Sequence, residues 1–213
     1  MKKLETLLKN YRDHVAERAA QGIPPLPLNA EQINCVTQLL EQDNNYENDF
    51  LLDLLINRVP PGVDEAAYIK ASWLTSIANG EKHCKYVDSQ KAIQLLGTMI
   101  GGYNVNSLIE LLKSKDNLLA KEAAQVLKDI ILVYDAANDI YDLSQNNIYA
   151  KEVINSWAKA EWFTNKNALP KEIICLAFKI DGETNTDDLS PAVHATSRPD
   201  IPLHSLSMLE FKK

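Results

Sequence analysis

Apolar residues recur at helical spacing from Leu4 to Phe163. Near the N-terminus Leu4, Leu8 and Tyr11 fall on one face of an α-helix, and Gly22 provides the stop signal. The same spacing, read with breaks such as Pro60-Pro61-Gly62, predicts further helices. The full set is Leu4–Gln21, Ala30–Glu41, Asp49–Val59, Glu65–Asn79, Ser89–Ile100, 104–113, 117 to about 133, Asp135–Leu143 and Asn147–Phe163.

Capping residues mark where several of these helices begin. Asn29 is a favourable N-cap, and Gln32, three residues later, completes a capping box. Asp64 is expected to start its helix, and Asn104 and Asn117 are expected to cap theirs.

Short connections make consecutive amphipathic helices antiparallel neighbours. The pattern therefore predicts a mainly α fold of about nine helices packed as stacked hairpins. The sequence shows no fixed repeat length. We expect this all-helical domain to span residues 1–165.

The pattern changes after residue 166. Residues Ile173–Ile180 read I-I-C-L-A-F-K-I, which is typical of a strand covered on both faces, and Asp181-Gly182 begins a turn. One strand cannot satisfy its own edges. We therefore expect residues 166–213 to be an incomplete α/β segment, with one strand, an acidic proline-containing loop and a short helix.

The loop Ile180–His204 combines three prolines with several acids, and Arg198 is its only strong base. Two interpretations of Arg198 are open. It could form a surface ion pair with a nearby acid such as Asp200. Alternatively, its planar fork, stiffened by Pro199, could grip a ligand carboxylate through two parallel N–H bonds. The surrounding acids disfavour an anionic ligand unless they cap helices or face away.

Composition narrows the class of protein. The chain has 213 residues, 46% of them hydrophobic and 24% charged, which is ordinary for a globular domain. Its net charge of −7 disfavours non-specific binding to nucleic acid or to anionic membranes. It contains no apolar run of membrane-spanning length and no unbroken apolar centre of a secretory signal, so we expect a cytoplasmic protein.

The sequence predicts no metal site. Cys35, Cys84 and Cys175 lie far apart, whereas an iron–sulfur cluster needs clustered thiolates. His83 stands beside Cys84, but no partners lie at ligand spacing. We assign no catalytic residue and no cofactor to the chain, and expect the thiols to be reduced.

Several long stretches resemble one family. GETNTDDLSPA followed by SRPDIPLHSLSML is similar to the opening of the swivel domain of the bacterial aconitase B family. HVAERAAQGIPPLPLNAEQ, DFLLDLLINRVPPGVDEAAYIKA, KAIQLLGTMIGGYN and NSWAKAEWF resemble the HEAT-like helical region that precedes it. The resemblance covers nearly the whole chain in the family's order.

The resemblance implies a fold and an activity. These lyases isomerise citrate and isocitrate through cis-aconitate in the tricarboxylic acid cycle, with a 4Fe-4S cluster as Lewis acid. The family's Ser-Arg-Pro segment supplies a substrate-binding arginine, which is Arg198 here by motif match. The cluster cysteines, the catalytic serine segment and the other substrate arginines of the family have no counterpart in this sequence.

Two local departures accompany these missing segments. Thr196 replaces an aromatic residue, and Asn106-Ser107 replaces His-Pro. We therefore predict an aconitase-B-like N-terminal region that is inactive alone and binds a tricarboxylate only if other domains complete the site. The alternative is a HEAT-like interaction module for self-association or a protein partner. RNA binding, known in the family, is disfavoured by the net charge.

Overall fold

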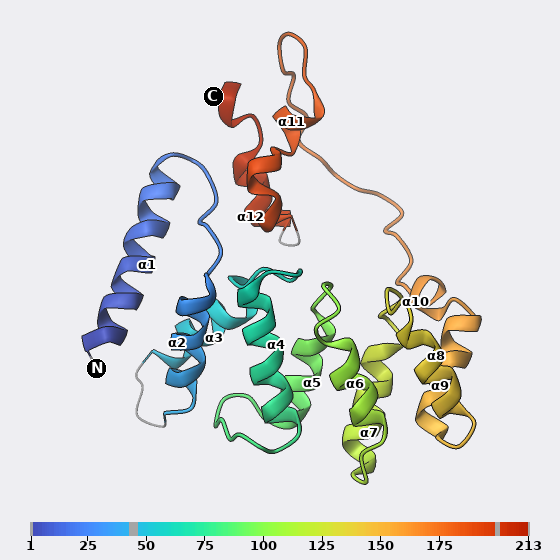
Figure 1. Cartoon of the computed structure of the whole chain (residues 1–213). Helices are drawn as coiled ribbons and strands as arrows, with labels where there is room; N and C mark the ends of the chain where they lie inside the picture. Colours follow the sequence, from blue (N-terminus) through green and yellow to red (C-terminus); the bar gives the residue numbers. More distant parts are fainter. Residues whose placement is uncertain (1, 43–46, 199–200, 213) are drawn as a thin grey trace. The chain divides into compact units, whose positions relative to one another are not determined.

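The computed structural model describes residues 2–42, 47–198 and 201–212 (Figure 1). These residues form a mainly α fold in which none is assigned to a β-strand. The chain folds into two compact units, residues 28–166 and residues 1–27 with 167–213. We call the first the helical unit and the second the terminal unit, since it joins both ends of the sequence.

Helices α2 to α10 make up the helical unit, in which sequence neighbours pair and each pair packs on the next. Helix α2 packs against α3, α4 against α5, α6 against α7 and α8 against α9, and successive pairs meet through α2 with α4, α5 with α7 and α7 with α9. The helices are α2 (Ala30–Leu40), α3 (Asn48–Asn57), α4 (Glu65–Ala78), α5 (Ser89–Gly97), α6 (Val105–Leu112), α7 (Asn117–Leu127), α8 (Ala136–Ser144), α9 (Ile148–Ala158) and α10 (Glu161–Thr164).

The core of this unit is aliphatic. Leu74, Leu96 and Leu112 are completely buried, as the helical spacing of apolar residues predicts. Lys70 of α4 is an exception because it is buried among them, and its Nζ donates to the Ile56 carbonyl at 3.4 Å. Desolvation by burial lowers the pKa of Lys70 to about 8. This ammonium therefore lies at the end of α3, where helix carbonyls lack partners within the helix.

The helix starts test the predicted caps individually. The capping box of Asn29 and Gln32 is confirmed, with both reciprocal bonds at 2.9 Å. The cap of α7 is Asp116 and not Asn117, because the Asp116 carboxylate accepts from Leu118 N–H at 2.8 Å. Asn104 also does not cap with its side chain. Its amide turns back and donates to the Leu96 and Met99 carbonyls at 2.7 and 3.1 Å.

Two predicted helices are shorter than their apolar patterns. Helix α7 ends at Leu127 and not near residue 133. The apolar residues 130–133 that follow it have no regular secondary structure. The segment 147–163 is broken at Ala160, which adopts a left-handed φ of 54° and separates α9 from α10. Periodicity alone does not detect a single residue with positive φ.

A close contact between two glycine-containing loops joins α3–α4 to α5–α6. Ile100 N–H donates to the Pro61 carbonyl at 2.9 Å, and the Tyr103 hydroxyl donates to the Val63 carbonyl at 2.9 Å. A Cβ on Gly101 would lie 2.1 Å from the Gly62 carbonyl oxygen. Gly101 is therefore required for this approach, a role beyond that of a helix stop.

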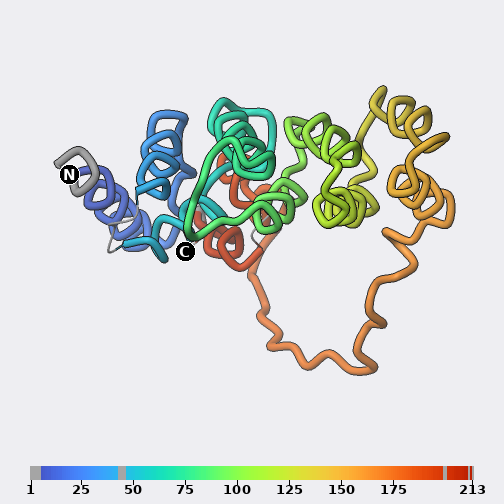
Figure 2. Tube along the Cα trace, turned by 90° about the horizontal axis from the view of Figure 1, so that it is seen from below, coloured from blue at the N-terminus to red at the C-terminus, as the bar shows by residue number. Residues whose placement is uncertain are grey.

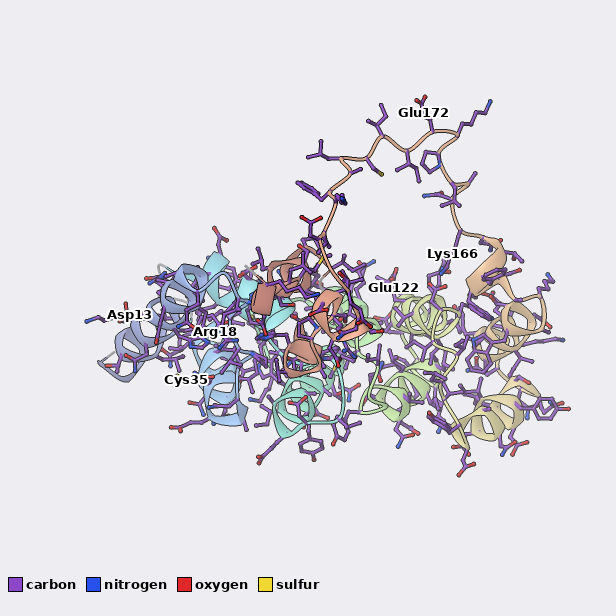
Figure 3. The ribbon with its side chains drawn as sticks, turned by 90° about the horizontal axis from the view of Figure 1, so that it is seen from above. Asp13, Arg18, Cys35, Glu122, Lys166 and Glu172 are labelled. Carbon is purple, nitrogen blue, oxygen red and sulfur yellow. The ribbon has the colours of Figure 1, made fainter. Side chains whose placement is uncertain are left out.

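The expected strand at Ile173–Ile180 is not formed. These residues have no regular secondary structure, and Ile174 and Leu176 are 91% and 82% exposed. Figure 2 shows this stretch as an extended orange tube, and in Figure 3 the Glu172 side chain beside it points outward. A strand needs a neighbouring strand for its backbone groups, and no segment among the described residues offers one.

The terminal unit contains α1 (Lys2–Ala20) and the segment after residue 182. A proline-rich strap, residues 23–27, follows α1 and makes polar contacts with that helix. The Tyr11 hydroxyl donates to the Leu26 carbonyl at 3.3 Å, and Leu26 N–H donates to His14 Nε2 at 2.9 Å. Within the parts of the chain that the structure describes, no helix combines the length and apolar character needed to cross a membrane.

Candidate functional site

The segment around Arg198 begins with a short helix, α11 (Thr186–Leu189), set by its own side chains. Asn185 and Asp188 form a capping box, with Asp188 N–H donating to Asn185 Oδ1 at 2.9 Å and Asn185 N–H donating to Asp188 Oδ2 at 3.0 Å. Ser190 ends the helix, and its N–H donates to the Thr186 carbonyl at 2.8 Å. Pro191, which is buried, then begins the next turn.

Two acids of the loop are engaged in structure. The pKa of Asp188 is lowered by two neighbours. The larger cause is the hydrogen bond that its carboxylate accepts from the Asn185 backbone N–H, and the second is the Lys212 ammonium 2.9 Å away. Asp181 forms an exposed ion pair with Lys179 at 3.5 Å. Asp188 therefore takes part in a helix cap, as an anionic ligand nearby would require, whereas Asp181 only forms a surface ion pair.

Arg198 follows the 3-10 helix η1 (Ala192–Ser197) directly and has an exposed side chain. Its Nη2 donates to the Ser190 carbonyl at 3.2 Å, which holds one edge of the guanidinium. A guanidinium has more N–H donors than this bond uses, in the planar arrangement that suits a carboxylate. The alternative pair with Asp200, and the stiffening by Pro199, lie outside the described residues.

Two serines that precede Arg198 contact the ring of a histidine that follows it. His204, at the end of α12 (Ile201–His204), has its Nδ1 2.7 Å from Ser197 Oγ and its Nε2 3.0 Å from Ser190 Oγ. Ser197 is buried and also donates to the His194 carbonyl at 2.7 Å. The imidazole thus bridges the residue before Arg198 and the residue whose carbonyl holds Arg198.

A second histidine connects this region to α1. His194 is buried, and its Nε2 lies 2.8 Å from the Glu210 carboxylate while its Nδ1 lies 3.5 Å from Arg18 Nη2. Arg18 Nε in turn donates to the Pro24 carbonyl at 2.5 Å. Figure 3 marks Arg18 on its helix. The terminal unit is therefore held together by a continuous set of polar contacts from the strap to Glu210.

Sequence reasoning identified Arg198 but not its neighbours. His204, Ser197 and Ser190 lie 7 and 14 positions apart in a segment without apolar period, so no spacing rule brings them together. The usable signal was compositional, since two histidines and several serines occur near one arginine. That signal predicts polar contacts in general and not which atoms meet.

The chain's own residues do not fit an iron–sulfur cluster. Within residues 2–42, 47–198 and 201–212, no three His, Cys, Asp or Glu side chains gather as a metal ion requires. Cys84 is buried and donates to the Leu40 carbonyl at 3.2 Å, Cys35 is partly buried on α2, and Cys175 is exposed.

The helical unit also contains a mostly apolar cavity of about 230 Å³, lined in part by Met99, Asn104 and Leu132. Asn104 Oδ1 is buried and has no hydrogen-bond partner among the residues described. Asn104 and Asp129 are the residues with polar side chains among those that line the cavity.

Two family models match the chain. The family model described as "Aconitate B N-terminal domain" matches residues 10–163, and the one described as "Aconitate hydratase 2 N-terminus" matches residues 175–213. The chain belongs to the aconitate hydratase B family. Its segment around Arg198 falls within the second match.

Individual relatives support the assignment. Aconitate hydratase B of Synechocystis sp. is 58% identical over 206 residues, 97% of this chain. The proteins of the same name from Pseudomonas aeruginosa and Escherichia coli are 51% and 53% identical, over 97% and 96% of the chain. The chain spans only 24% of the length of each of these relatives. It corresponds to their N-terminal part.

Proposed function

We propose that this chain is the N-terminal part of an aconitate hydratase that interconverts citrate and isocitrate through cis-aconitate. Residues 1–165 form its HEAT-like domain and residues 166–213 begin its swivel domain. The matches of two family models, one on each side of residue 170, support this division. The chain's part in the reaction is to hold a substrate carboxylate, and the protein works in the cytoplasm.

One observation carries the proposal: the Arg198 side chain is exposed, and one edge of its guanidinium is held by the Ser190 carbonyl. Because Ser190 fixes one edge of the fork, less rotamer entropy is lost when a carboxylate binds the remaining N–H groups. A charge-assisted bidentate contact of this kind is stronger than a neutral hydrogen bond and selects planar anions. The tricarboxylate is therefore recognised through one of its carboxylates.

The chain alone is inactive under this proposal. The chemistry of the family needs a 4Fe-4S cluster, which supplies a Lewis acid, and its ligands must come from sequence beyond this chain. We expect no cis-aconitate from citrate after iron–sulfur reconstitution of the purified chain, followed by ultraviolet absorbance. Turnover that tracks chain concentration would contradict this part.

Isothermal titration of citrate into the chain tests the carboxylate site. The complete tricarboxylate site needs other domains, but the Arg198 guanidinium should hold one carboxylate weakly in the isolated chain. We expect this weak binding to fall at least about tenfold in Arg198→Ala, corresponding to one lost charge-assisted pair. Arg12→Ala is the matched control, since it removes the same charge from an exposed position of the terminal unit. Equal loss in both variants would point to general electrostatic attraction, and no loss in either would exclude Arg198.

A protein-interaction module is the second candidate function, with a second copy of this chain as the partner. Its support is the exposure of large apolar side chains between the end of α7 and the start of α9, among them Leu132, Tyr141 and Ile148. Sedimentation equilibrium should then show a concentration-dependent dimer that Leu132→Ser together with Ile148→Ser weakens. A monomer at high concentration would remove this candidate.

RNA binding has the least support, because the net charge of −7 opposes contact with phosphates. A filter-binding assay over a range of salt concentrations decides it. Retention of RNA on the filter that falls steeply with salt concentration would support RNA as a partner, and retention at the background level would exclude RNA binding.

A further inference from the structure

The His204 ring lies between the hydroxyls of Ser190 and Ser197, two serines that precede Arg198 in the sequence. Its Nδ1 is 2.7 Å from Ser197 Oγ, and its Nε2 is 3.0 Å from Ser190 Oγ. One ring therefore connects the two ends of the turn from Ser190 to Ser197. Neither contact is made by the guanidinium itself.

The hydrogen-bond donors assign the protons of the ring. Ser197 has one hydroxyl proton, which it donates to the His194 carbonyl at 2.7 Å. Its oxygen must then accept from His204, so Nδ1 carries a proton. In the neutral ring Nε2 is the acceptor and receives the Ser190 hydroxyl proton; in the charged ring Nε2–H donates to Ser190 Oγ. Both contacts persist in either charge state.

These contacts control two features of Arg198. Ser197 precedes Arg198, so it fixes where the backbone delivers the side chain. Ser190 supplies the carbonyl that accepts from Arg198 Nη2 at 3.2 Å, so it fixes the direction of the guanidinium. An arginine that is not held in this way loses considerably more rotamer entropy on binding.

The support for His204 extends further into the terminal unit. The carbonyl that receives the Ser197 proton belongs to His194, whose ring contacts Glu210 at 2.8 Å and Arg18 at 3.5 Å. His194 is therefore held on both edges, and Ser197 has a fixed acceptor. The polar path runs from α1 through His194, Ser197 and His204 to Arg198.

We infer that His204 is a positioning residue for the carboxylate site at Arg198, acting through Ser190 and Ser197. The inference rests on the proposed function, because it assigns His204 a role in the same site. His204 does not contact the carboxylate. Its effect on binding must pass through Arg198.

A double-mutant cycle with tricarballylate as the probe tests this path. His204→Phe keeps an aromatic ring and removes both hydrogen bonds, and we expect it to weaken binding by about tenfold. In an Arg198→Ala background the same change should have no further effect, because a positioning residue acts only through the group it positions. Parent-like binding by His204→Phe, or effects that multiply, would overturn the inference.

His14→Phe is the matched control, since His14 is a hydrogen-bonded histidine of the same unit that accepts from Leu26 N–H at 2.9 Å. It should leave binding unchanged. If it weakens binding as much as His204→Phe does, the effect is general loss of structure and the inference fails.

Nuclear magnetic resonance supplies a readout that needs no ligand. The neutral His204 ring should be the Nδ1–H tautomer, and the Arg198 Nε–H bond should lose order in His204→Phe but not in His14→Phe. The opposite tautomer, or unchanged order, would overturn the inference. If tricarballylate does not bind the parent chain, or if Arg198→Ala leaves its binding unchanged, the proposed function fails. The order of the Arg198 Nε–H bond in His204→Phe would still show whether His204 positions Arg198.

Discussion

The helical unit and the segment from residue 183 to residue 212 are held together in different ways. The helical unit buries aliphatic side chains such as Leu74 and Leu96, and among its buried polar groups Lys70 has a lowered pKa and Ser156 Oγ has no hydrogen-bond partner among the described residues. Among the described residues of the later segment, the buried polar side chains are those of His194, Ser197 and Ser207, and each makes hydrogen bonds. Burial of apolar area is nearly directionless, whereas a hydrogen bond fixes atoms in place. The second mode fits the role proposed for this segment, which is to aim the Arg198 guanidinium.

The stretch 173–180 sharpens the comparison. It is as apolar as a helix core, yet its side chains are exposed, because it has neither a period that matches a neighbour nor polar groups that bond locally. The segment after it buries polar side chains and is held together by local hydrogen bonds. Apolar content therefore orders a segment only where a partner surface exists.

Gly101→Ala should have the largest effect and fall on the helical unit. The added Cβ would lie 2.1 Å from the Gly62 carbonyl oxygen, which is backbone and cannot move aside cheaply. We expect a loss of about 3 kcal/mol in the free energy of unfolding by urea denaturation. Gly62→Ala is the control, since nothing lies within 4 Å of its Cβ. Equal stability of the two variants would refute the close contact.

Lys70→Met should stabilise the helical unit by about 2 kcal/mol at pH 7, because it removes a buried ammonium. The folded-state pKa of about 8 lies below the ordinary 10.5, so the unfolded chain binds more protons between these pH values. The parent's free energy of unfolding should therefore rise with pH across that window. The variant should not show this rise, and a parallel pH dependence in both proteins would contradict the assignment.

A matched pair of serines compares the two modes directly. Ser197→Ala should cost about 1–2 kcal/mol, because it leaves the His194 carbonyl and His204 Nδ1 without their partner. Ser156 is equally buried in the helical unit, but its Oγ has no hydrogen-bond partner among the described residues. Ser156→Ala should then be neutral or stabilising by up to about 1 kcal/mol. Thermal unfolding of both variants measures the difference, and similar losses would remove the contrast.

The smallest effect is expected at acid pH. The Asn185 N–H and Lys212 lower the pKa of Asp188, so its contribution to stability is present above the ordinary value and is lost as pH falls through the folded pKa. Amide exchange at Asn185 should accelerate below about pH 4. Asp188→Asn should abolish that pH dependence, and a carboxyl titration at or above the ordinary pKa would show that these bonds are absent.

Most of the helical unit could be predicted because its signals are local. The spacing around Leu74 and the box of Asn29 with Gln32 each depend on residues within one helix. The features that the sequence did not predict correctly depend on residues far apart in the chain or on the conformation of a single residue. Asn104 turns back to α5, Ala160 breaks a helix through one dihedral angle, and Ile173–Ile180 has no strand to pair with among the described residues.

The motif resemblance points to Arg198, but the contacts around this residue could not be predicted from the sequence. His204 meets Ser190 and Ser197 through a non-periodic fold, and His194 meets Arg18 across 176 positions of sequence. Contacts of this length depend on the whole unit folding. They become visible only in three dimensions.

Arg198→Lys is the most direct test that the fork of Arg198 grips a carboxylate. Lysine keeps the positive charge but is a point donor that cannot form two parallel bonds or retain the Ser190 contact in the same way. Titration of tricarballylate should show affinity lower by about tenfold than that of the parent chain. Equal affinity would mean that only charge matters at this position and would contradict a site built around the guanidinium.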